Sequence, residues 1–276
     1  MLLLAFDTST RQSSIALCSD DTVFYEYTWN TGGNHSVELL ENMQRLLAAC
    51  GRSFQELDGI AVATGPGSFN GARVAVATAK ALAFSLQKPL IGVGTLDLLA
   101  FQQQQWRGVI CAVLEAGRTE LYSACFRAAW VQDKQGNLIP QLERISDYFL
   151  LPVDELGQRV QELLAENEVL APALFCGEIK SATRQRLYAQ LQAKAVFLPA
   201  LRTTRHASAL AALALPRLLA GKIEDPLTLE PFYMRRPSIT KSTRKRPLLG
   251  GLEVAESEQQ QRDTQQTERE EGALRH

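Results

Sequence analysis

The stretch TGPGSFNGARVAVATAKALA, at residues 64–83, most limits what this chain can fold into. It follows an apolar run, LDGIAVATG at 57–65, which predicts a strand that is buried on both faces. Gly65 and Gly67 permit a sharp exit from that strand, and Ser68 can cap the alanine-rich helix that follows. Together these residues predict one strand–turn–helix unit of an α/β protein.

The turn itself could hold a phosphate or could simply start the helix. GPGSFNG lacks the Gly-Lys-Ser/Thr of a Walker A loop, and it is not a G-x-G-x-x-G with an acidic residue downstream. The sequence therefore favours a turn that starts a helix over a nucleotide loop.

The rest of the chain predicts two series of elements with a similar plan. The first has strands at 2–7, 13–19 and 22–29, a helix at 36–50 that Asn34 or Ser36 could cap and Gly51 ends, the unit just described, and a short apolar segment at 89–94. The second has strands at 108–117, 120–127 and 137–145, followed by a helix at 153–167, a strand at 172–178, a helix at 179–193, a strand at 195–199 and a helix at 206–221. Each series has hairpin strands followed by alternating helices and strands. This repetition predicts a duplicated α/β unit.

Composition narrows the functional class. The formal net charge is −1, so there is no general attraction to nucleic acid or anionic lipid, and a partner would supply most contacts to RNA. The five cysteines are scattered and form no Cys-x-x-Cys pair, which argues against a disulfide framework and a zinc site. The start MLLLAFDTST has no basic leader, and no window has the length of a membrane span, so we expect a cytoplasmic protein that contacts no membrane.

The last part of the chain has a different character. Residues 237–276 are mostly charged or polar, which predicts a disordered tail. The run KSTRKR at 241–246 could contact RNA, but a solvated basic patch is the favoured interpretation.

Asp7 is the first candidate for chemistry, at the end of the first strand in FDTST. A carboxylate there resembles the first phosphate loop of the actin, Hsp70 and sugar-kinase superfamily. Ser9, however, stands where those loops usually have a glycine, and its side chain should obstruct a phosphate. The favoured alternative is that Asp7 and Thr8 pair with amides of their own turn.

The histidines indicate no metal or catalytic site. His35 has Leu39 one helical turn later, where a second metal ligand would stand, and His206 begins a helix as a cap or surface residue. No serine, cysteine or metal arrangement of a protease is evident. We therefore predict no catalytic residue, no cofactor-binding residue and no metal ligand.

The chain contains, in this order, FDTST, NHSVELLENMQRLL, GPGSFNGARVAVATAKALA, VLEAGRTELYSACF and LEPFYMRRP. In their order and spacing these stretches resemble the bacterial TsaB (YeaZ) family, over about residues 1–236. The resemblance implies the two-lobed fold of the actin, Hsp70 and sugar-kinase superfamily, with duplicated ribonuclease H-like lobes. The N-terminal, partner-binding lobe would be 1–105 and the C-terminal lobe 106–236.

The resemblance also implies a function. Family members are non-catalytic partners of TsaD, the related subunit that transfers a threonylcarbamoyl group to the adenosine beside the anticodon of tRNA. A TsaE-like ATPase joins the pair, tRNA binds through the complex, and the chain could form a homodimer when alone. TsaD-like proteins carry a His-x-x-x-His metal motif on the equivalent helix. This chain has His35 and Leu39 there, which fits an inactive paralogue.

The helix from Ala72 to Leu86 carries the sharpest expectation. Its sheet-facing side holds Ala75, Ala79, Leu82, Ala83 and Leu86, and Val76, Ala77 and Phe84 make the opposite side apolar as well. That side is covered either by this chain's own first helix or second lobe, or by the TsaD-like partner, as the resemblance implies. The predicted partner interface is His35, Asn42, Arg73, Val76, Ala77, Lys80 and Phe84.

Two other functional classes compete with the scaffold. A stand-alone phosphotransferase or ATPase of the same superfold is the main alternative, and it differs at the loop where Ser9 replaces the glycine. A peptidase is the third, and it lacks the motifs it needs.

Overall fold

The structure, a computed structural model of the whole chain, describes residues 1–32, 34–132, 136, 138–166 and 172–235. The described residues up to 235 belong to one compact unit. The predicted tail at 237–276, with its KSTRKR run, lies outside the described residues.

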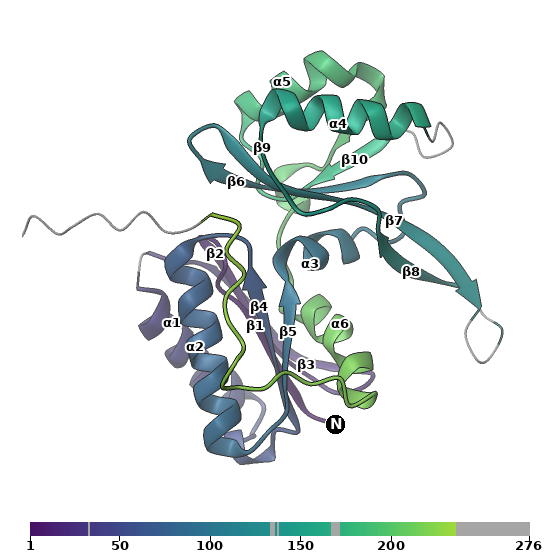
Figure 1. Cartoon of the computed structure of the whole chain (residues 1–276). Coiled ribbons are helices and arrows are strands. Elements are labelled where there is room, and N and C mark those ends of the chain that lie inside the picture. Colours follow the sequence, from purple (N-terminus) through teal and green to yellow (C-terminus); the bar gives the residue numbers. More distant parts are fainter. Residues whose placement is uncertain (33, 133–135, 137, 167–171, 236–276) are drawn as a thin grey trace, which may run out of the picture. The chain divides into compact units, whose positions relative to one another are not determined.

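The first sheet has the strand order β3-β2-β1-β4-β5 (Figure 1). Its strands are β1 Leu3–Asp7, β2 Gln12–Cys18, β3 Val23–Asn30, β4 Gly59–Gly65 and β5 Leu90–Gly94. β1, β2 and β3 form an antiparallel meander, whereas β4 runs parallel to β1 and β5 parallel to β4. The carboxyl ends of β1, β4 and β5 therefore meet at one edge, where Asp7 and Gly65 lie.

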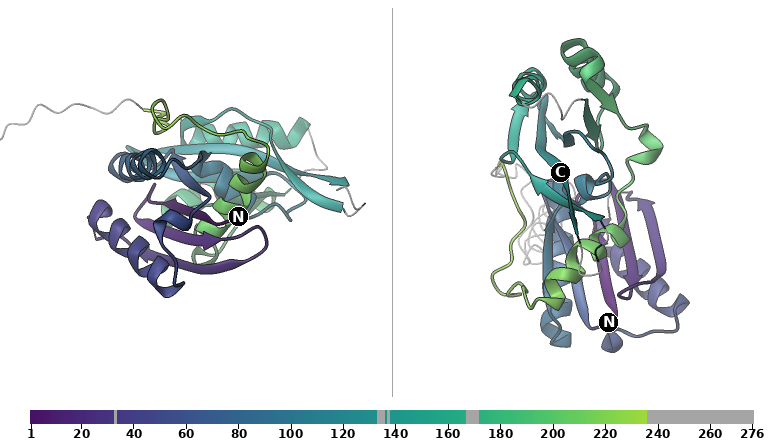
Figure 2. Two further views of the ribbon diagram at one scale, coloured as in Figure 1. Left: turned by 90° about the horizontal axis from the view of Figure 1, so that it is seen from below. Right: turned by 90° about the vertical axis from the view of Figure 1, so that its right-hand side faces the viewer.

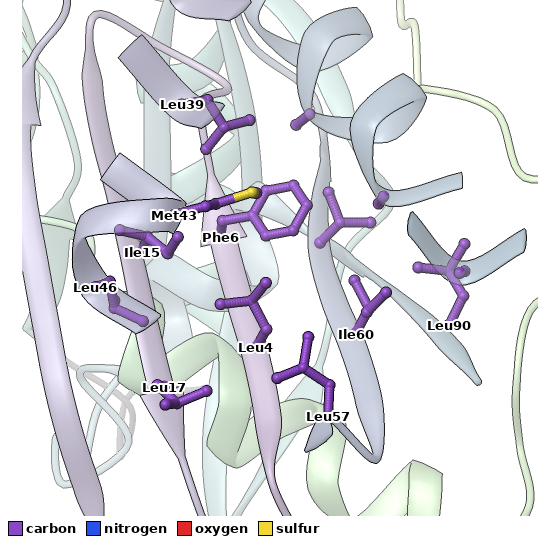
Figure 3. Packing of buried hydrophobic residues seen from close by; sticks show 14 of the residues in the cluster. Leu4, Phe6, Ile15, Leu17, Leu39, Met43, Leu46, Leu57, Ile60 and Leu90 are labelled. Atoms are coloured by element: carbon purple, nitrogen blue, oxygen red, sulfur yellow. The ribbon is translucent and has the colours of Figure 1, made fainter. Parts of the chain in front are cut away.

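Two helices cover one face of this sheet. α1 spans His35–Ala49 and α2 spans Phe69–Leu86. Leu39, Met43 and Leu46 of α1 pack with Phe6, Leu4 and Ile15 of the sheet in a fully buried cluster (Figure 3). Ala75, Ala79 and Ala83 of α2 face the same core, as the helical periodicity predicted. Their small side chains let α2 lie close to the strands.

The second sheet has the order β11-β10-β6-β7-β8, with β9 also paired to β7. Its strands are β6 Ile110–Gly117, β7 Glu120–Gln132, β8 Leu138–Arg144, β9 Phe149–Pro152, β10 Ala173–Cys176 and β11 Ala195–Phe197. β6, β7 and β8 are antiparallel, while β10 and β11 run parallel to β6, which repeats the pattern of the first sheet. α4 Val153–Glu166 and α5 Ser181–Leu191 cover one face, and α3 Thr95–Phe101 covers the other (Figure 1).

This duplicated arrangement is the two-lobed fold of the actin, Hsp70 and sugar-kinase superfamily that the sequence resemblance predicted. Two elements were not predicted: the short helix α3 and the four-residue strand β9. α3 has seven residues, fewer than the window of about 11–18 residues in which helical periodicity is recognised, and β9, FLLP, shows no alternation of apolar and polar residues. No helix in the described ranges is long and apolar enough to cross a bilayer.

The last helix packs on a different sheet from the one that the expected lobe boundaries imply. α6, Ala207–Leu219, follows the second sheet in sequence, and the expected C-terminal lobe at 106–236 included it. It packs instead on the first sheet (Figure 2), where Leu210, Ala211 and Ala214 lie in one buried cluster with Leu3, Ala5 and Ile91. The first sheet would otherwise expose its second apolar face, and α6 covers it.

Residues 225–235, called here the C-terminal strap, continue from α6 along α2 (Figure 1). Lys80 Nζ donates to the carbonyl oxygens of Leu227 and Leu229, at 3.2 and 2.9 Å. The Phe232 amide then donates to the Thr64 carbonyl at 2.8 Å. The Phe232 ring lies 5.2 Å from that of Tyr148, between β8 and β9. The strap thus contacts elements of both sheets.

Candidate functional site

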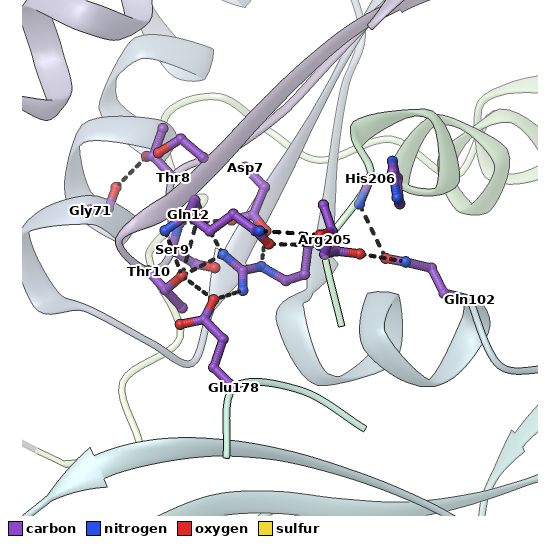
Figure 4. Close-up of polar contacts among 12 residues, drawn as sticks. Asp7, Thr8, Ser9, Thr10, Gln12, Gly71, Gln102, Glu178, Arg205 and His206 are labelled. Carbon is purple, nitrogen blue, oxygen red and sulfur yellow. Dashed lines mark hydrogen bonds and ion pairs between the residues drawn. The ribbon is translucent and has the colours of Figure 1, made fainter. Parts of the chain in front are cut away.

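The carboxyl end of β1 holds a buried ion-pair cluster centred on Arg205 (Figure 4). Asp7 is the last residue of β1, Glu178 follows β10, and Arg205 precedes α6. Arg205 Nε donates to Asp7 Oδ2 at 2.7 Å, and Nη1 donates to Glu178 Oε1. Nη2 donates to Thr10 Oγ1 at 2.5 Å and to the Gln12 carbonyl at 2.6 Å. One guanidinium therefore joins carboxylates that follow strands of the two sheets.

The Arg205–Asp7 pair is sealed from solvent, whereas Glu178 is partly exposed. The Arg205 and Asp7 side chains are 1% and 0% exposed, and Glu178 is 37% exposed. Burial lowers the pKa of Arg205, but the carboxylates of Asp7 and Glu178 outweigh it, so the net change in that pKa is upward. The second oxygen of Asp7 accepts the Ser9 amide at 2.7 Å, as expected for a turn carboxylate. Both carboxylate oxygens thus have partners within the chain.

The loop after β1 lies directly against the glycine turn. The Ser68 amide donates to the Ser9 carbonyl at 2.5 Å, and Thr8 Oγ1 donates to the Gly71 carbonyl at 2.8 Å. A Cβ atom on Gly67 would lie 2.1 Å from Ser9 O, and one on Gly71 would lie 1.9 Å from Thr8 O. These glycines are needed for contact between two backbone segments.

Ser68 caps α2 as predicted, since its Oγ accepts the Gly71 amide at 3.3 Å. The start of α2 therefore matches the predicted helix-starting turn. The Gly71 and Ala72 amides of its first turn donate to Ser68, whose own amide donates to the Ser9 carbonyl.

The two histidines of the described ranges, His35 and His206, lie at the starts of different helices. His35 is the first residue of α1, and Leu39 one turn later is 0% exposed in the first core. Within the described ranges, no three His, Cys, Asp or Glu side chains are close enough to hold a metal ion. His206 caps α6 through its backbone, and its Nδ1 lies 3.2 Å from Glu26 Oε2.

Three of the seven predicted interface residues are exposed, and the other four are buried, half-buried or bound by other parts of the chain. Arg73, Ala77 and Phe84 are exposed on one side of α2, and Phe84 is 62% exposed. Val76 is 2% exposed and packs in the first core, so the expectation that it lies on the outward side is wrong. α1 lies alongside α2 and covers it. This covering by the chain's own first helix is the alternative that the sequence left open.

The remaining predicted residues also differ in accessibility. Asn42 is 8% exposed within α1, and His35 is half-buried. Lys80 is held by the two strap carbonyls, which makes it a contact within the chain. The outward stripe of α2 is therefore Arg73, Ala77, Ala81 and Phe84, and we use "α2 stripe" for these four residues.

Sequence reasoning missed Arg205 altogether. It stands in TTRHAS, a polar segment before a helix, where an arginine is ordinarily solvated. Its partner Asp7 is 198 positions away, so no local pattern connects the two. The sequence offered one indication: a carboxylate that is buried at the end of a strand, such as Asp7, requires a cation beside it.

Comparison with known proteins agrees with this fold. The TsaD family, described as tRNA N6-adenosine threonylcarbamoyltransferase, matches residues 30–240. The tRNA threonylcarbamoyladenosine biosynthesis protein TsaB of Bacillus subtilis is 35% identical over 187 residues, covering 68% of this chain and 75% of that protein. The TsaB protein of Escherichia coli is 35% identical over 128 residues, covering 45% of this chain and 54% of its own length.

Solved structures give the same relationship. A Pseudomonas aeruginosa protein described as similar to the peptidase YeaZ superposes with a TM-score of 0.66 at 26% identity, covering 85% of this chain and 99% of that one. A structure of YeaZ from the same organism gives a TM-score of 0.64 at 25% identity, covering 84% and 99%. With the matching sequence family and the two-sheet fold, these similarities show that the chain belongs to the TsaB (YeaZ) family of tRNA threonylcarbamoyladenosine biosynthesis proteins.

Proposed function

We propose that this chain is a non-catalytic subunit that binds and activates a TsaD-like threonylcarbamoyltransferase. The complex makes N6-threonylcarbamoyladenosine beside the anticodon of tRNA. The observation that carries the proposal is the Arg205–Asp7 pair, because it occupies the one carboxylate at the carboxyl end of β1.

Nucleotide chemistry on this fold would require an accessible carboxylate or a metal beside the phosphates. Asp7 is 0% exposed, and its oxygens accept hydrogen bonds from Arg205 and from the Ser9 amide. To bind Mg²⁺ it would have to lose a buried ion pair, which is strongly unfavourable. Leu39 in place of a second histidine likewise supports a subunit that holds no metal on α1.

The α2 stripe supports the partner role. It presents Phe84, 62% exposed, together with the small Ala77 and Ala81, so a partner helix could approach closely. We assign partner binding to the first lobe, which residues 1–105 form together with α6 on the second face of their sheet. A TsaE-like ATPase and tRNA join through the TsaD-like subunit, and the same stripe serves a homodimer when the chain is alone. The complex works in the cytoplasm.

Reconstitution tests the proposal. The purified chain alone should hydrolyse no ATP and form no modified adenosine. The TsaD-like subunit, supplied with tRNA and threonylcarbamoyl-adenylate, should form the modified adenosine only after the chain is added.

Three outcomes would overturn the proposal. One is ATP turnover by a clean preparation that Asp7→Asn abolishes and Asp21→Asn, an exposed control, leaves intact. Another is cleavage of a protein substrate that responds to a chelator or protease inhibitor. The third is full activity of the TsaD-like subunit without this chain. Circular dichroism of Asp7→Asn establishes that the variant is folded.

A further inference from the structure

Two cysteines of the second lobe face each other across neighbouring strands. Cys111 of β6 and Cys125 of β7 are directly paired in the antiparallel register, and their Sγ atoms are 3.5 Å apart. Both side chains lie on the face of the sheet that α4 and α5 cover. All five cysteines are free thiols in the structure.

The backbone hydrogen bonds of Cys125 show whether the two cysteines form a hydrogen-bonded or a non-hydrogen-bonded pair of the antiparallel ladder. Its amide donates to Ser146 Oγ at 2.8 Å, and its carbonyl accepts the Ile145 amide at 2.9 Å. Both groups point away from β6, because a strand residue directs its N–H and C=O to the same side. Cys111 and Cys125 therefore form a non-hydrogen-bonded pair, in which Cα atoms lie about 4.5 Å apart. That separation falls inside the range of about 4.4–6.8 Å that a disulfide spans.

The pair is buried but not inaccessible. Cys111 is 0% exposed and Cys125 is 3% exposed. Cys125 lines a cavity of about 600 Å³, together with Arg144, Ser146, Phe149 and Arg159. A small oxidant can therefore reach Cys125 before it reaches Cys111. The hydrogen bond to Cys125, together with burial, also raises the pKa of Cys111, so the Cys111 thiolate forms less readily than that of an ordinary thiol.

We propose that Cys111 and Cys125 are a modification site, which a peroxide converts into a reversible cross-strand disulfide. The Cys125 thiolate, having lost its proton, attacks one peroxide oxygen, the O–O bond breaks, and water leaves once the second oxygen is protonated. The Cys111 sulfur attacks the sulfur of the resulting sulfenic acid, the S–O bond breaks, and the leaving hydroxide takes the Cys111 proton and departs as a second water. Both sulfurs are oxidised and both peroxide oxygens are reduced, so the reaction balances with one peroxide and two waters.

The experiment uses the full chain with Cys50→Ser, which removes a partly exposed thiol that could link two chains. After mild treatment with hydrogen peroxide and alkylation in denaturant, two thiols should be lost. Peptide mapping should show Cys111 linked to Cys125, and dithiothreitol should restore both thiols. The oxidised protein should melt at a higher temperature, because the crosslink constrains the unfolded chain.

Matched variants separate this pair from general oxidation. Cys125→Ser and Cys111→Ser should each abolish the linked peptide and the rise in melting temperature. Cys176→Ser, which removes an equally buried thiol on the opposite face, should retain both. The proposal is overturned if the peroxide yields only sulfinic or sulfonic acids at Cys125. It also fails if the wild-type peptide map shows Cys111 and Cys125 unlinked after the other thiols have reacted.

Discussion

At the scale of single residues, the buried guanidinium of Arg205 neutralises the Asp7 carboxylate at the end of β1. Arg205→Met leaves the Asp7 carboxylate buried without a cation. Removing one partner of a buried ion pair costs about 3–5 kcal/mol, so the free energy of unfolding in urea should fall by that amount. Arg45→Met, which breaks an exposed pair with Glu41, should cost at most about 0.5 kcal/mol.

A double variant provides the decisive control. Asp7→Leu combined with Arg205→Met removes both charges, and it should recover part of the lost stability because no unpaired charge remains. Equal stability of Arg205→Met and wild type would show that the ion pair does not hold this end of β1.

The carboxyl group of Asp97 should make the stability of the fold depend on pH. Burial raises the pKa of its carboxyl, and the hydrogen bond from the Tyr148 hydroxyl, at 2.5 Å, opposes this only in part. The folded state therefore binds the proton more tightly than the unfolded state, so this group's stabilising contribution is lost as the pH rises from about 4 through the folded pKa. The free energy of unfolding of Asp97→Asn, relative to wild type, should increase over that window in urea titrations.

Asp21 provides a control, because the pKa of its carboxyl shifts in the opposite direction. Hydrogen bonds from the Thr22 and Ser19 hydroxyls lower its carboxyl pKa, so its contribution to stability is lost as the pH falls. The relative stability of Asp21→Asn should therefore decrease as the pH rises. If both variants followed the same trend, the assignment of the Asp97 shift to burial would be wrong.

At the scale of elements, α2 places a core residue and a surface residue side by side. Val76 is 2% exposed and Ala77 is exposed. Val76→Glu should therefore collapse the fold, because it buries an unpaired charge. Ala77→Glu should keep the wild-type melting curve but weaken the TsaD-like complex by at least roughly a hundredfold in calorimetric titration.

An exposed alanine of the second lobe controls for the added charge. Ala189→Glu, on α5, should leave both folding and partner affinity unchanged. Unchanged affinity of Ala77→Glu would place the partner elsewhere, whereas a loss of affinity by both variants would indicate a nonspecific charge effect.

At the scale of the whole molecule, the C-terminal strap and the tail should behave differently when removed. Cutting after residue 224 removes Tyr233, whose ring lies 5.0 Å from Phe69, and Arg235, which pairs with Glu120. It also removes Leu229, which packs against the first core. The melting temperature should fall by several degrees, on the order of 1–2 kcal/mol of stability.

Cutting after residue 240 should leave the melting temperature nearly unchanged, because the removed segment has few apolar residues. A drop of several degrees in this variant would show that the tail docks on the rest of the chain. A strong loss of tRNA affinity, measured at fixed salt, would make the KSTRKR run an RNA contact.

Much of the fold follows from residues that lie near one another in the sequence. The continuous apolar run at 57–65, the glycine turn and the alanine-rich helix predicted β4 and α2, and Ser68 was identified as the cap. Periodicity also identified the sheet-facing residues Ala75, Ala79 and Ala83. These predictions succeed because helix periodicity, strand burial and caps depend on side chains a few positions apart.

The candidate site was decided by contacts between distant segments. Four features depend on contacts between segments that are far apart in the sequence, so no local pattern predicts them. They are the pairing of Arg205 with Asp7, the packing of α6 on the first sheet, the hydrogen bonds of Lys80 to the strap and the burial of Val76. The sequence by itself determined most of the elements, though not α3 and β9, and it also determined the duplicated plan and the family. Only the tertiary structure decided which apolar face is covered and which charge is neutralised, because burial and ion pairing depend on the neighbours that folding supplies.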